Sequence, residues 1–200
     1  IPTYNRENII KNAIDSILSH SFQDFEIIII DNGSTDNTKQ FIKSYSSAKI
    51  KYLCQIGSGS PANPRNTGIR NSSAPWVCFL DSDDYWLPNK LEVLSQAIDA
   101  NKEADVFYHY EIMLNQNTGK QTVLSHRRKL DNMYKDMLEN GNQLSTSATT
   151  IRRSFLNDHQ LFFNENHNFD IVEDYDLWLR VANKKAKFFL IKEVLGVYLV

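Results

Sequence analysis

This sequence of 200 residues lacks the features that mark several classes of protein. Its two cysteines, Cys54 and Cys78, are too few for a disulfide framework or a structural zinc site, and we expect both to be buried strand thiols in a reducing compartment. The longest aliphatic run, Ile27–Ile30, is far too short to span a bilayer. A formal net charge of -2 argues against a protein that coats nucleic acid, so we expect no nucleic-acid partner.

Several catalytic signatures are also missing. The histidines are scattered, without a pair at metal-ligand spacing, and no Gly-x-Ser-x-Gly elbow is present. The run Gly57-Ser58-Gly59 lacks the third glycine and the lysine of a phosphate loop, which predicts a flexible loop instead. No signal peptide opens the chain. Because it begins without Met and closes on a strand-like run, we expect a piece of a longer protein, truncated at both ends.

What is present is a repeated switch between helical and strand periodicity in the first hundred residues. Helical spacing of apolar residues alternates with β-branched runs, which is typical of a mostly parallel sheet with helices on its faces. The pattern therefore predicts an α/β fold with parallel neighbouring strands near 26–31, 50–54 and 76–80, separated by helices near 9–18, 36–45, 63–72 and 88–101.

The second half has a different pattern. The runs 106–114 and 122–124 flank a polar turn and predict antiparallel strands. Helices are expected over 130–139 and 171–183, and late strands over 188–191 and 194–200. We expect one domain with two halves, residues 1–101 and residues 102–200, the second being a smaller mixed or antiparallel part.

Polar clusters follow three of the expected strands. They are Pro2–Asn5, Asp31–Asp36 and Asp81–Asp84. In open α/β sheets the ligand crevice lies at the carboxyl ends of the strands. We therefore expect these clusters, and in particular Asp31 and Asp83, to lie at one edge of the sheet.

The run Asp81-Ser82-Asp83-Asp84 is the strongest of these signals. Three carboxylates in four residues repel one another unless a cation or solvent relieves them. Mg²⁺ or Mn²⁺ bound by one or two carboxylates and a substrate diphosphate would do so. The equally weighted alternative is a solvated acidic turn in which Asp84 caps the next helix.

A second acidic pair, Glu173-Asp174, stands at the start of an expected helix. Negative charge is favourable at a helix N-terminus, and for the pair taken by itself this structural interpretation is the better one. The functional interpretation is a general base. Asp176, two residues further on, is interpreted as a surface charge.

Together these motifs resemble glycosyltransferase family 2. The resemblance covers nearly the whole chain and is carried by five motifs in order: Pro2-Thr3-Tyr4-Asn5-Arg6, Phe25–Asp36, Arg65-Asn66-x-Gly68-Ile69, Asp81-Ser82-Asp83-Asp84 and Glu173–Trp178. It implies the GT-A fold, with a nucleotide-sugar-binding half followed by an acceptor-binding half. It also implies transfer of a sugar from a nucleoside-diphosphate donor with inversion at the anomeric carbon.

The resemblance implies roles for particular residues. Pro2, Thr3 and Tyr4 would line the nucleoside pocket, and Asp31 and Ser82 belong to the same donor site. Asn32 stands where the family commonly has an acid that contacts uracil; an amide also pairs with uracil, so a UDP-sugar is favoured. Arg65 would approach the diphosphate or the sugar, Asp81 the ribose or the sugar, Asp83 would hold Mn²⁺ or Mg²⁺, and Asp174 would be the base.

Two alternatives stay open. A sugar-nucleotidyltransferase has a similar fold, but it would carry a glycine-rich basic loop after its first strand, which Pro2–Glu7 is not. A non-catalytic module that binds sugar nucleotides or glycans would fit a degenerate site, whereas both acidic motifs are intact. The family context further implies a glycan or lipid-linked acceptor, cell-surface polysaccharide or glycoconjugate synthesis, and a cytoplasmic location. Peripheral attachment to the inner face of the membrane would come through segments outside this sequence.

Overall fold

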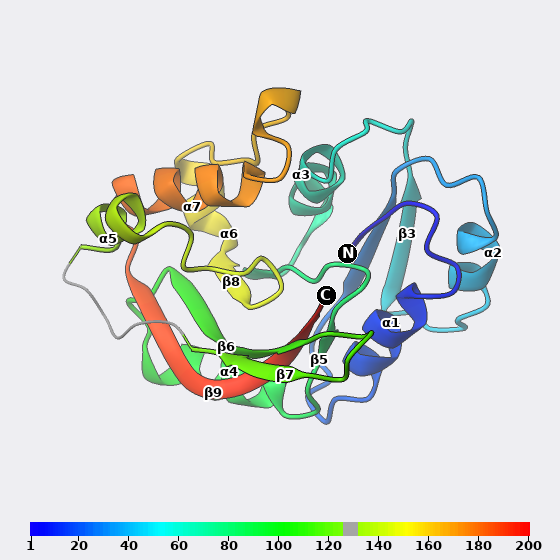
Figure 1. The fold of residues 1–200 in the computed structure, drawn as a ribbon, viewed down its shortest axis with the longest axis horizontal. Coiled ribbons are helices and arrows are strands. Elements are labelled where there is room, and N and C mark those ends of the chain that lie inside the picture. Colours follow the sequence, from blue (N-terminus) through cyan, green and yellow to red (C-terminus); the bar gives the residue numbers. More distant parts are fainter. Residues whose placement is uncertain (126–131) are drawn as a thin grey trace.

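The computed structural model describes residues 1–125 and 132–200. A parallel sheet in the order β1-β2-β3 forms one side of the molecule (Figure 1). Its strands are β1 (Pro2–Thr3), β2 (Ile27–Asp31) and β3 (Ile50–Cys54). Thr3 lies opposite Asp31, and Asp31 lies opposite Cys54, so the carboxyl ends of all three strands meet at one edge.

Helices cover both faces of this sheet: α1 (Ile10–Leu18), α2 (Thr38–Lys43) and α3 (Ala62–Asn71). Ile27 and Ile29 pack in one core cluster with α1 and α2. Ile30 points the other way, toward Gly68 of α3. Because side chains alternate along a strand, the uninterrupted run of isoleucines in β2 supplies both faces, as expected for a strand buried on both sides.

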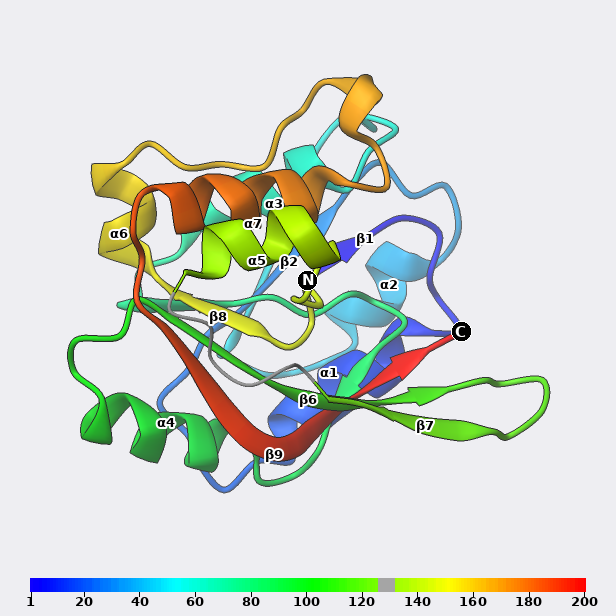
Figure 2. The same cartoon turned by 60° about the vertical axis from the view of Figure 1, so that its left-hand side comes forward.

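The rest of the chain forms a curled mixed sheet in the order β4-β8-β6-β9-β5, with β7 paired to β6 (Figures 1 and 2). The strands pair mostly antiparallel, but the two long ones, β6 and β9, are parallel. Their bounds are β4 (Trp76–Cys78), β5 (Tyr85–Trp86), β6 (Val106–Leu114), β7 (Gln121–Leu124), β8 (Thr149–Arg152) and β9 (Phe188–Leu199).

The α/β prediction is confirmed, but the pairing expected for residues 76–80 is wrong. Strand β4 pairs antiparallel with β8, with Val77 opposite Ile151. It is therefore part of the curled sheet and not a parallel neighbour of β2 and β3. The two late strands expected over 188–191 and 194–200 are one strand, whose register against β6 shifts on both sides of Tyr110.

Helices also sandwich the curled sheet. Leu94 of α4 (Lys90–Ala100) packs with Phe107, whereas Trp178 of α7 (Glu173–Asn183) packs with Val106 and Tyr108, which face the other way. Leu177, Trp178 and Val181 are fully buried, at the helical spacing expected for the inward face of this helix. Three shorter elements complete this part: α5 (Met133–Asn140), α6 (Arg153–Asp158) and the 3₁₀ turn His167–Phe169. Residues 130 and 131 of the helix expected over 130–139 lie outside the described residues.

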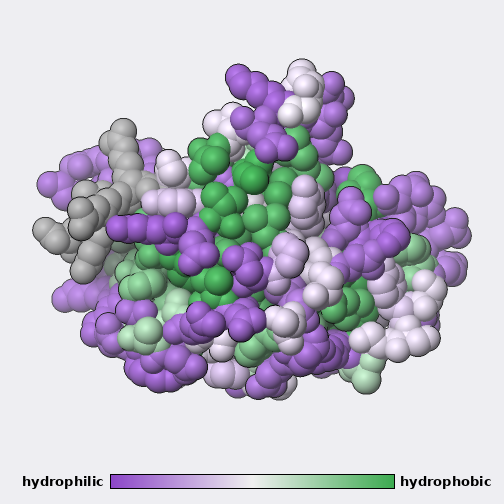
Figure 3. Space-filling model, turned by 90° about the horizontal axis from the view of Figure 1, so that it is seen from below, coloured by the Kyte–Doolittle hydropathy of each residue, from purple (hydrophilic) through white to green (hydrophobic). Residues whose placement is uncertain are grey.

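The outer face of the molecule seen from below combines apolar and polar side chains. Figure 3 shows hydrophobic side chains gathered near the middle of this face, with hydrophilic ones around them.

Cys54 is exposed and not buried as expected, because it lies on β3, the edge strand of the parallel sheet. Cys78 is partly buried and its sulfur accepts a hydrogen bond from Thr150. Among the described residues, no helix has the length and apolarity needed to cross a membrane.

Candidate active site

Four of the residues singled out in the sequence line one cleft of about 590 Å³. They are Arg65 of α3, Asp81 after β4, and Glu173 and Asp174 in the first turn of α7. The rest of the lining comes from Ile171, the end of β7, Tyr198 of β9 and the segment between α5 and β8. Three parts of the chain that are far apart in the sequence thus bring three carboxylates and one guanidinium to the same cavity.

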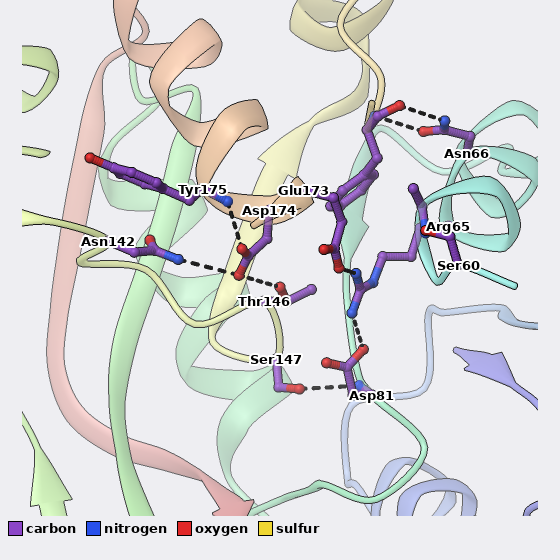
Figure 4. A network of polar contacts seen from close by, with 12 residues as sticks. Ser60, Arg65, Asn66, Asp81, Asn142, Thr146, Ser147, Glu173, Asp174 and Tyr175 are labelled. Atoms are coloured by element: carbon purple, nitrogen blue, oxygen red, sulfur yellow. Dashed lines mark hydrogen bonds and ion pairs between the residues drawn. The ribbon is translucent and has the colours of Figure 1, made fainter. Parts of the chain in front are cut away.

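Arg65 lies at the centre of this group (Figure 4). Its two terminal nitrogens donate to Glu173 Oε1 at 2.6 Å and to Asp81 Oδ1 at 2.7 Å. Burial alone would lower the pKa of the guanidinium, but the two carboxylates raise it. Its Nε atom has no hydrogen-bond partner among the described residues. Arg65 therefore fixes two acids that come from different elements, and the Nε edge of its guanidinium is left unpaired among the described residues.

Asp174 is held separately from the Arg65 cluster. Its Oδ2 accepts from Thr146 Oγ1 at 3.1 Å and from Asn142 Nδ2 at 3.3 Å, and its Oδ1 accepts from the Tyr175 backbone N–H (Figure 4). Burial raises the pKa of Asp174 above its ordinary value, while the hydrogen bond from Tyr175 opposes that rise. A carboxylate with a raised pKa that lines a cleft is suited to accept a proton.

The acidic turn after β4 divides its carboxylates between the interior and solvent. Asp83 is about 40% exposed and meets Arg6 at 3.4 Å, whereas Asp84 is buried. Asp84 accepts from Ser147 Oγ and from the Leu199 N–H. Burial raises the pKa of Asp84 to about 7. The alternative in which Asp84 caps the next helix is wrong, because Asn89 precedes α4 and Asp84 is turned into the core.

The described residues do not contain a preformed metal centre. No group of three or more His, Cys, Asp or Glu side chains within 1–125 and 132–200 is arranged to hold a metal ion. Asp83 nevertheless fits a cation that arrives with its substrate. Mg²⁺ and Mn²⁺ in such sites take one or two carboxylates and complete their shell with phosphate oxygens and water. The half-exposed carboxylate of Asp83 can supply one such ligand.

The polar side chains that follow β2 are engaged within the protein. Asp31 is fully buried; one of its oxygens accepts from the Ser34 N–H and the other from the Tyr52 hydroxyl. The Asn32 oxygen accepts from the side chain of Gln55 and from the backbone and hydroxyl of Ser58. Both side chains therefore fix loops around the predicted donor site.

The residues at the start of the chain form the other part of that predicted site. Pro2 and Thr3 are in β1, and the Thr3 carbonyl accepts from the Asn32 N–H. Thr3 Oγ1 is buried without a hydrogen-bond partner among the described residues, whereas Tyr4 is 55% exposed. An exposed aromatic ring beside a buried strand end is available to stack on a base.

Two glycines set the distance between the loops after β2 and β3. A side chain at Gly33 would place its Cβ 2.8 Å from the backbone nitrogen of Gly57, and Gly33 also has a φ of +87°. A Cβ at Gly57 would lie 2.9 Å from the Asn32 carbonyl oxygen. The segment Gly57–Gly59 is a loop, as expected, and its backbone at Gly57 lies close to the loop after β2.

The structure unites the acids of the cleft but leaves the β1 and β2 residues outside its lining. Arg6 connects the start of the chain to α2 and to the acidic turn: its backbone N–H donates to Thr38 Oγ1, and its guanidinium meets Asp83, which itself lies outside the lining of the cleft. Ser82, which precedes Asp83 in the sequence, is buried. Asp176 pairs with Arg180 one turn along α7, and is only partly exposed.

Sequence reasoning missed the polar residues between α5 and β8. Asn142 and Thr146 hold Asp174, and Ser147 contacts both Asp81 and Asp84. No motif marks them, because isolated Asn, Ser and Thr are ordinary loop residues. Arg6 stood within a recognised motif but was assigned no role.

Comparisons with known proteins identify the family of the chain. The profile of "Glycosyl transferase family 2" matches residues 1–159. WfgD of Escherichia coli, a UDP-Glc:alpha-D-GlcNAc-diphosphoundecaprenol beta-1,3-glucosyltransferase, is 29% identical over 181 residues, which cover 90% of this chain and 67% of WfgD. An uncharacterized glycosyltransferase of Rickettsia bellii is 40% identical over 102 residues, covering 50% of this chain and 15% of the relative.

Solved structures give the same result for the fold. TarS 1-349 of S. aureus in complex with UDP superposes with a TM-score of 0.79 at 25% identity, covering all of this chain and 59% of TarS 1-349. The mannosyltransferase PcManGT of Pyrobaculum calidifontis, solved with GDP-Man and Mn²⁺, gives 0.69 at 16% identity, covering 98% of this chain and 55% of PcManGT. The chain therefore spans little more than half the length of these structures. Its fold is GT-A, and the chain belongs to glycosyltransferase family 2.

Proposed function

We propose that this chain transfers a sugar from a nucleoside-diphosphate sugar to a hydroxyl group of an acceptor, with inversion at the anomeric carbon. The observation that carries the proposal is the shared cleft of Asp81, Arg65, Glu173 and Asp174. In this cleft Asp174, a partly buried carboxylate with a raised pKa, shares the lining with Asp81 from the turn after β4. Family membership and the GT-A fold support the same class of reaction.

The chemistry assigned to the residues is a single displacement. Asp174 accepts the proton of the attacking hydroxyl, whose oxygen forms the new bond to the anomeric carbon. The bond between that carbon and the diphosphate oxygen breaks, and its electron pair leaves with the diphosphate. Attack from the side opposite the leaving group inverts the anomeric configuration. A positioned base of this kind typically contributes roughly 10²–10⁴-fold to the rate.

The donor site is assigned to the ends of β1 and β2 and to the turn after β4. Tyr4 would stack on the base, with Pro2 and Thr3 beside it, while Asp31 and Asn32 keep the surrounding loops in place. Asp81 and Ser82 would face the ribose or the sugar. A UDP-sugar is favoured, because TarS was solved with UDP and with UDP-GlcNAc, and WfgD is named for UDP-Glc.

A divalent cation is assigned to Asp83. When bound there with the donor, Mn²⁺ or Mg²⁺ would neutralise the negative charge of the departing diphosphate. PcManGT, which shares the fold, was solved with Mn²⁺. Arg6, which pairs with Asp83, is a further positive charge at this position.

Arg65 is assigned a positioning role besides the donor contact that the family resemblance suggests. Both of its terminal nitrogens are engaged by Glu173 and Asp81, and its side chain is almost fully buried. It would therefore act on the donor through Asp81, whose orientation it fixes, in addition to any contact with the sugar.

The acceptor is assigned to the half formed by residues 102–200, because the wall of the cleft next to Asp174 comes from this half. A glycan or lipid-linked acceptor is favoured, since WfgD is named for a diphosphoundecaprenol-linked one. Synthesis of cell-surface polysaccharide or glycoconjugate at the cytoplasmic face of the membrane stays a prediction from the family.

The test is release of UDP from UDP-glucose and UDP-GlcNAc by the purified chain, with Mn²⁺, with Mg²⁺ and with EDTA. Binding is measured in parallel by thermal shift, because a ligand that binds only the folded state raises the apparent stability. We expect metal-dependent binding of UDP and slow metal-dependent release of UDP from a sugar donor. Asp174→Asn should retain binding and lose release.

Other results would favour the two alternatives. Binding of UDP-sugars without any turnover, with or without added acceptors, would indicate a non-catalytic module. Formation of a sugar nucleotide from a sugar phosphate and UTP would indicate a nucleotidyltransferase. Absence of nucleotide binding by the folded chain would contradict the transferase, the nucleotidyltransferase and a module that binds sugar nucleotides, and would leave a glycan-binding module.

A further inference from the structure

The segment between α5 and β8 touches both acids of the proposed reaction. Thr146 and Ser147 are adjacent in a turn, and both are buried. Their hydroxyl groups nevertheless serve different partners. Figure 4 shows Thr146 directed toward Asp174 and Ser147 directed toward Asp81.

Thr146 is bound to the proposed base. Its Oγ1 donates to Asp174 Oδ2 at 3.1 Å, and Asn142 donates to the same oxygen from the other end of the segment. Asp174 Oδ1 is fixed by its own helix, through the Tyr175 N–H. The carboxylate plane of Asp174 is thus determined jointly by α7 and by this segment.

Ser147 is bound to the acidic turn after β4. Its Oγ accepts from the Asp81 backbone N–H at 3.1 Å and donates to Asp84 Oδ2 at 2.6 Å. Its carbonyl oxygen accepts from Trp86 Nε1 and from the buried Lys90 ammonium, so the residue is fixed by its backbone as well. One hydroxyl therefore connects the backbone of Asp81 to a buried carboxylate.

We infer that Thr146 and Ser147 are positioning residues that hold the two ends of the reaction separately: Thr146 orients the base Asp174, and Ser147 orients Asp81 on the donor side. This inference rests on the proposed function. It predicts that two neighbouring hydroxyl groups affect different steps, one the transfer and the other the binding of the donor. A purely structural role for the segment would affect both steps together.

Removal of the Thr146 hydroxyl changes the base in a defined direction. A hydrogen bond donated to a carboxylate stabilises its charged form. Burial raises the pKa of Asp174; among the charged groups that act on it, Glu173 raises it and Arg65 lowers it, and the Thr146 hydroxyl also lowers it. In Thr146→Val the pKa of Asp174 should therefore rise further, and the acid limb of the rate profile should move to higher pH.

The first experiment compares Thr146→Val, Thr146→Ser and Thr150→Val. Thr150→Val is the matched control, because Thr150 is a buried threonine four residues away whose hydroxyl contacts Cys78 and no acid of the cleft. The rate of UDP release from UDP-glucose and UDP-GlcNAc with Mn²⁺ is measured across pH, together with the dissociation constant of each donor. We expect Thr146→Val to lower kcat about tenfold, as for loss of one hydrogen bond to a charged group, with little change in donor affinity.

The conservative variant separates positioning from packing. Thr146→Ser keeps the hydroxyl and removes a methyl group, so it should restore most of kcat and the parent pH profile. If Thr146→Val has the kcat and the acid limb of the parent, or weakens donor binding as much as it lowers kcat, the inference is wrong for Thr146.

The second experiment uses Ser147→Ala at a temperature where the variant is folded. We expect a weaker affinity for UDP-sugar, by about tenfold, and an unchanged acid limb, because Asp174 keeps its hydrogen bonds from Thr146, Asn142 and the Tyr175 N–H. An unchanged dissociation constant would overturn the role of Ser147. If Ser147→Ala does not fold, the Thr146 variants alone decide whether a neighbouring hydroxyl orients Asp174. In Thr146→Val, Asp174 keeps its hydrogen bond from Asn142.

Failure of this inference can be distinguished from failure of the proposed function. The pKa of Asp174 is measured by NMR titration of the parent and of Thr146→Val, which requires no turnover. A higher pKa in the variant supports the positioning of Asp174 by Thr146 even if the parent releases no UDP, and an unchanged pKa overturns it. An inactive parent with intact nucleotide binding contradicts only the proposed function.

Discussion

Polar groups are kept in place by different means in two regions of the molecule. One region is the loops at the ends of the parallel strands, and the other is the layer between α7 and the curled sheet. At the strand ends most of the bonds are made by neutral amides and hydroxyls. The Asn5 oxygen accepts from the Thr35 N–H, and the Asn32 oxygen accepts from Ser58. In the layer beside α7, ionised side chains are buried together, with Arg65 between Asp81 and Glu173.

This difference determines how each region responds to substitution. A neutral hydrogen bond contributes about 1 kcal/mol net, and water replaces it easily near the surface. A buried ion pair, in contrast, leaves an uncompensated charge when one partner is removed. We therefore expect the neutral hydrogen bonds of the strand-end loops to tolerate single changes with a loss of binding alone, and the buried layer to lose stability or catalysis.

The largest expected effect lies in the buried layer, at Asp174. Asp174→Asn keeps the shape of the side chain and removes the base, so transfer should fall by roughly 10²–10⁴-fold. Because the pKa of Asp174 is raised, activity of the parent should be lost as pH falls through that raised value. The variant's residual rate should lack this acid limb.

Steady-state rates of UDP release across pH check the prediction, with the donor dissociation constant as the control. A parallel collapse of donor affinity would make Asp174 a donor-binding residue. Transfer at the parent rate would place the base elsewhere. Glu173 would be tested next and Asp176 after it, although Glu173 is paired with Arg65 at 2.6 Å.

The next largest effect concerns stability, at Arg65. Arg65→Met fills similar space but leaves the carboxylates of Asp81 and Glu173 without their cation, and the expected loss is about 3–5 kcal/mol in the free energy of unfolding. Arg70→Met on the same helix is the control. Arg70 is 52% exposed and meets Glu165 at 4.0 Å, so its loss should be about 0–1 kcal/mol.

Urea denaturation of both variants measures the difference. Equal losses for Arg65→Met and Arg70→Met would contradict the distinction between a buried and a surface ion pair. Addition of Glu173→Gln to Arg65→Met should recover part of the lost stability, because it removes one of the two buried charges left behind.

A smaller effect on stability, but a specific effect on binding, is expected at Asp83. The carboxylate is about 40% exposed, so Asp83→Asn should leave the midpoint of thermal unfolding nearly unchanged. It should abolish the part of UDP-sugar affinity that depends on Mn²⁺. Isothermal titration with and without Mn²⁺ measures this, and Asp99→Asn is a control at an exposed acid away from the cleft. Unchanged Mn²⁺-dependent affinity would remove Asp83 from the metal site.

The parallel half could be predicted in detail because its signals are local. The run Ile27–Ile30 can only be buried on both faces, and its end at Asp31 is where β2 ends. The helix over α1 follows from Ile10, Ala13, Ile14 and Ile17 at helical spacing, all of which are buried. Pairing of β2 with β3 joins neighbours in the chain, which is the most frequent arrangement in sheets.

The curled half could be predicted only in part because its pairings are distant. Strand β4 was expected beside β2, but its hydrogen bonds go to β8, more than seventy residues further along the chain. Strand β8 itself was not predicted, since Thr149–Arg152 is short and mixed in polarity. Register between such segments is decided by packing, and a local pattern carries no information about the partner.

For the candidate site, residue types and spacing located the acids but not their environment. The four residues Arg65, Asp81, Glu173 and Asp174 do share a cleft. The sequence did not reveal that Arg65 forms two ion pairs or that Asp84 is buried. Burial depends on elements that are distant in the sequence and pack over the residue. Asp84 is covered by Ser147 and by the end of β9.

The smallest effect is expected at Ile171, which precedes the buried acids of α7. Its φ is +79°, a left-handed conformation that costs a β-branched residue about 1–2 kcal/mol, while its side chain is 93% exposed. Asparagine adopts this conformation more readily, so Ile171→Asn should raise the free energy of unfolding by about 1 kcal/mol. Ile56→Asn is the control, since Ile56 is 94% exposed and has no positive φ.

Urea denaturation should show a gain for Ile171→Asn and little change for Ile56→Asn. Equal changes in the two variants would mean that the backbone at Ile171 carries no strain. The side chain of Ile171 also lines the cleft beside Asp174, so the same variant reports on function. A gain in stability with a lower rate of transfer to an added acceptor, and an unchanged rate of donor hydrolysis, would show that the side chain of Ile171 contacts the acceptor. An unchanged transfer rate would make the strain incidental to the reaction.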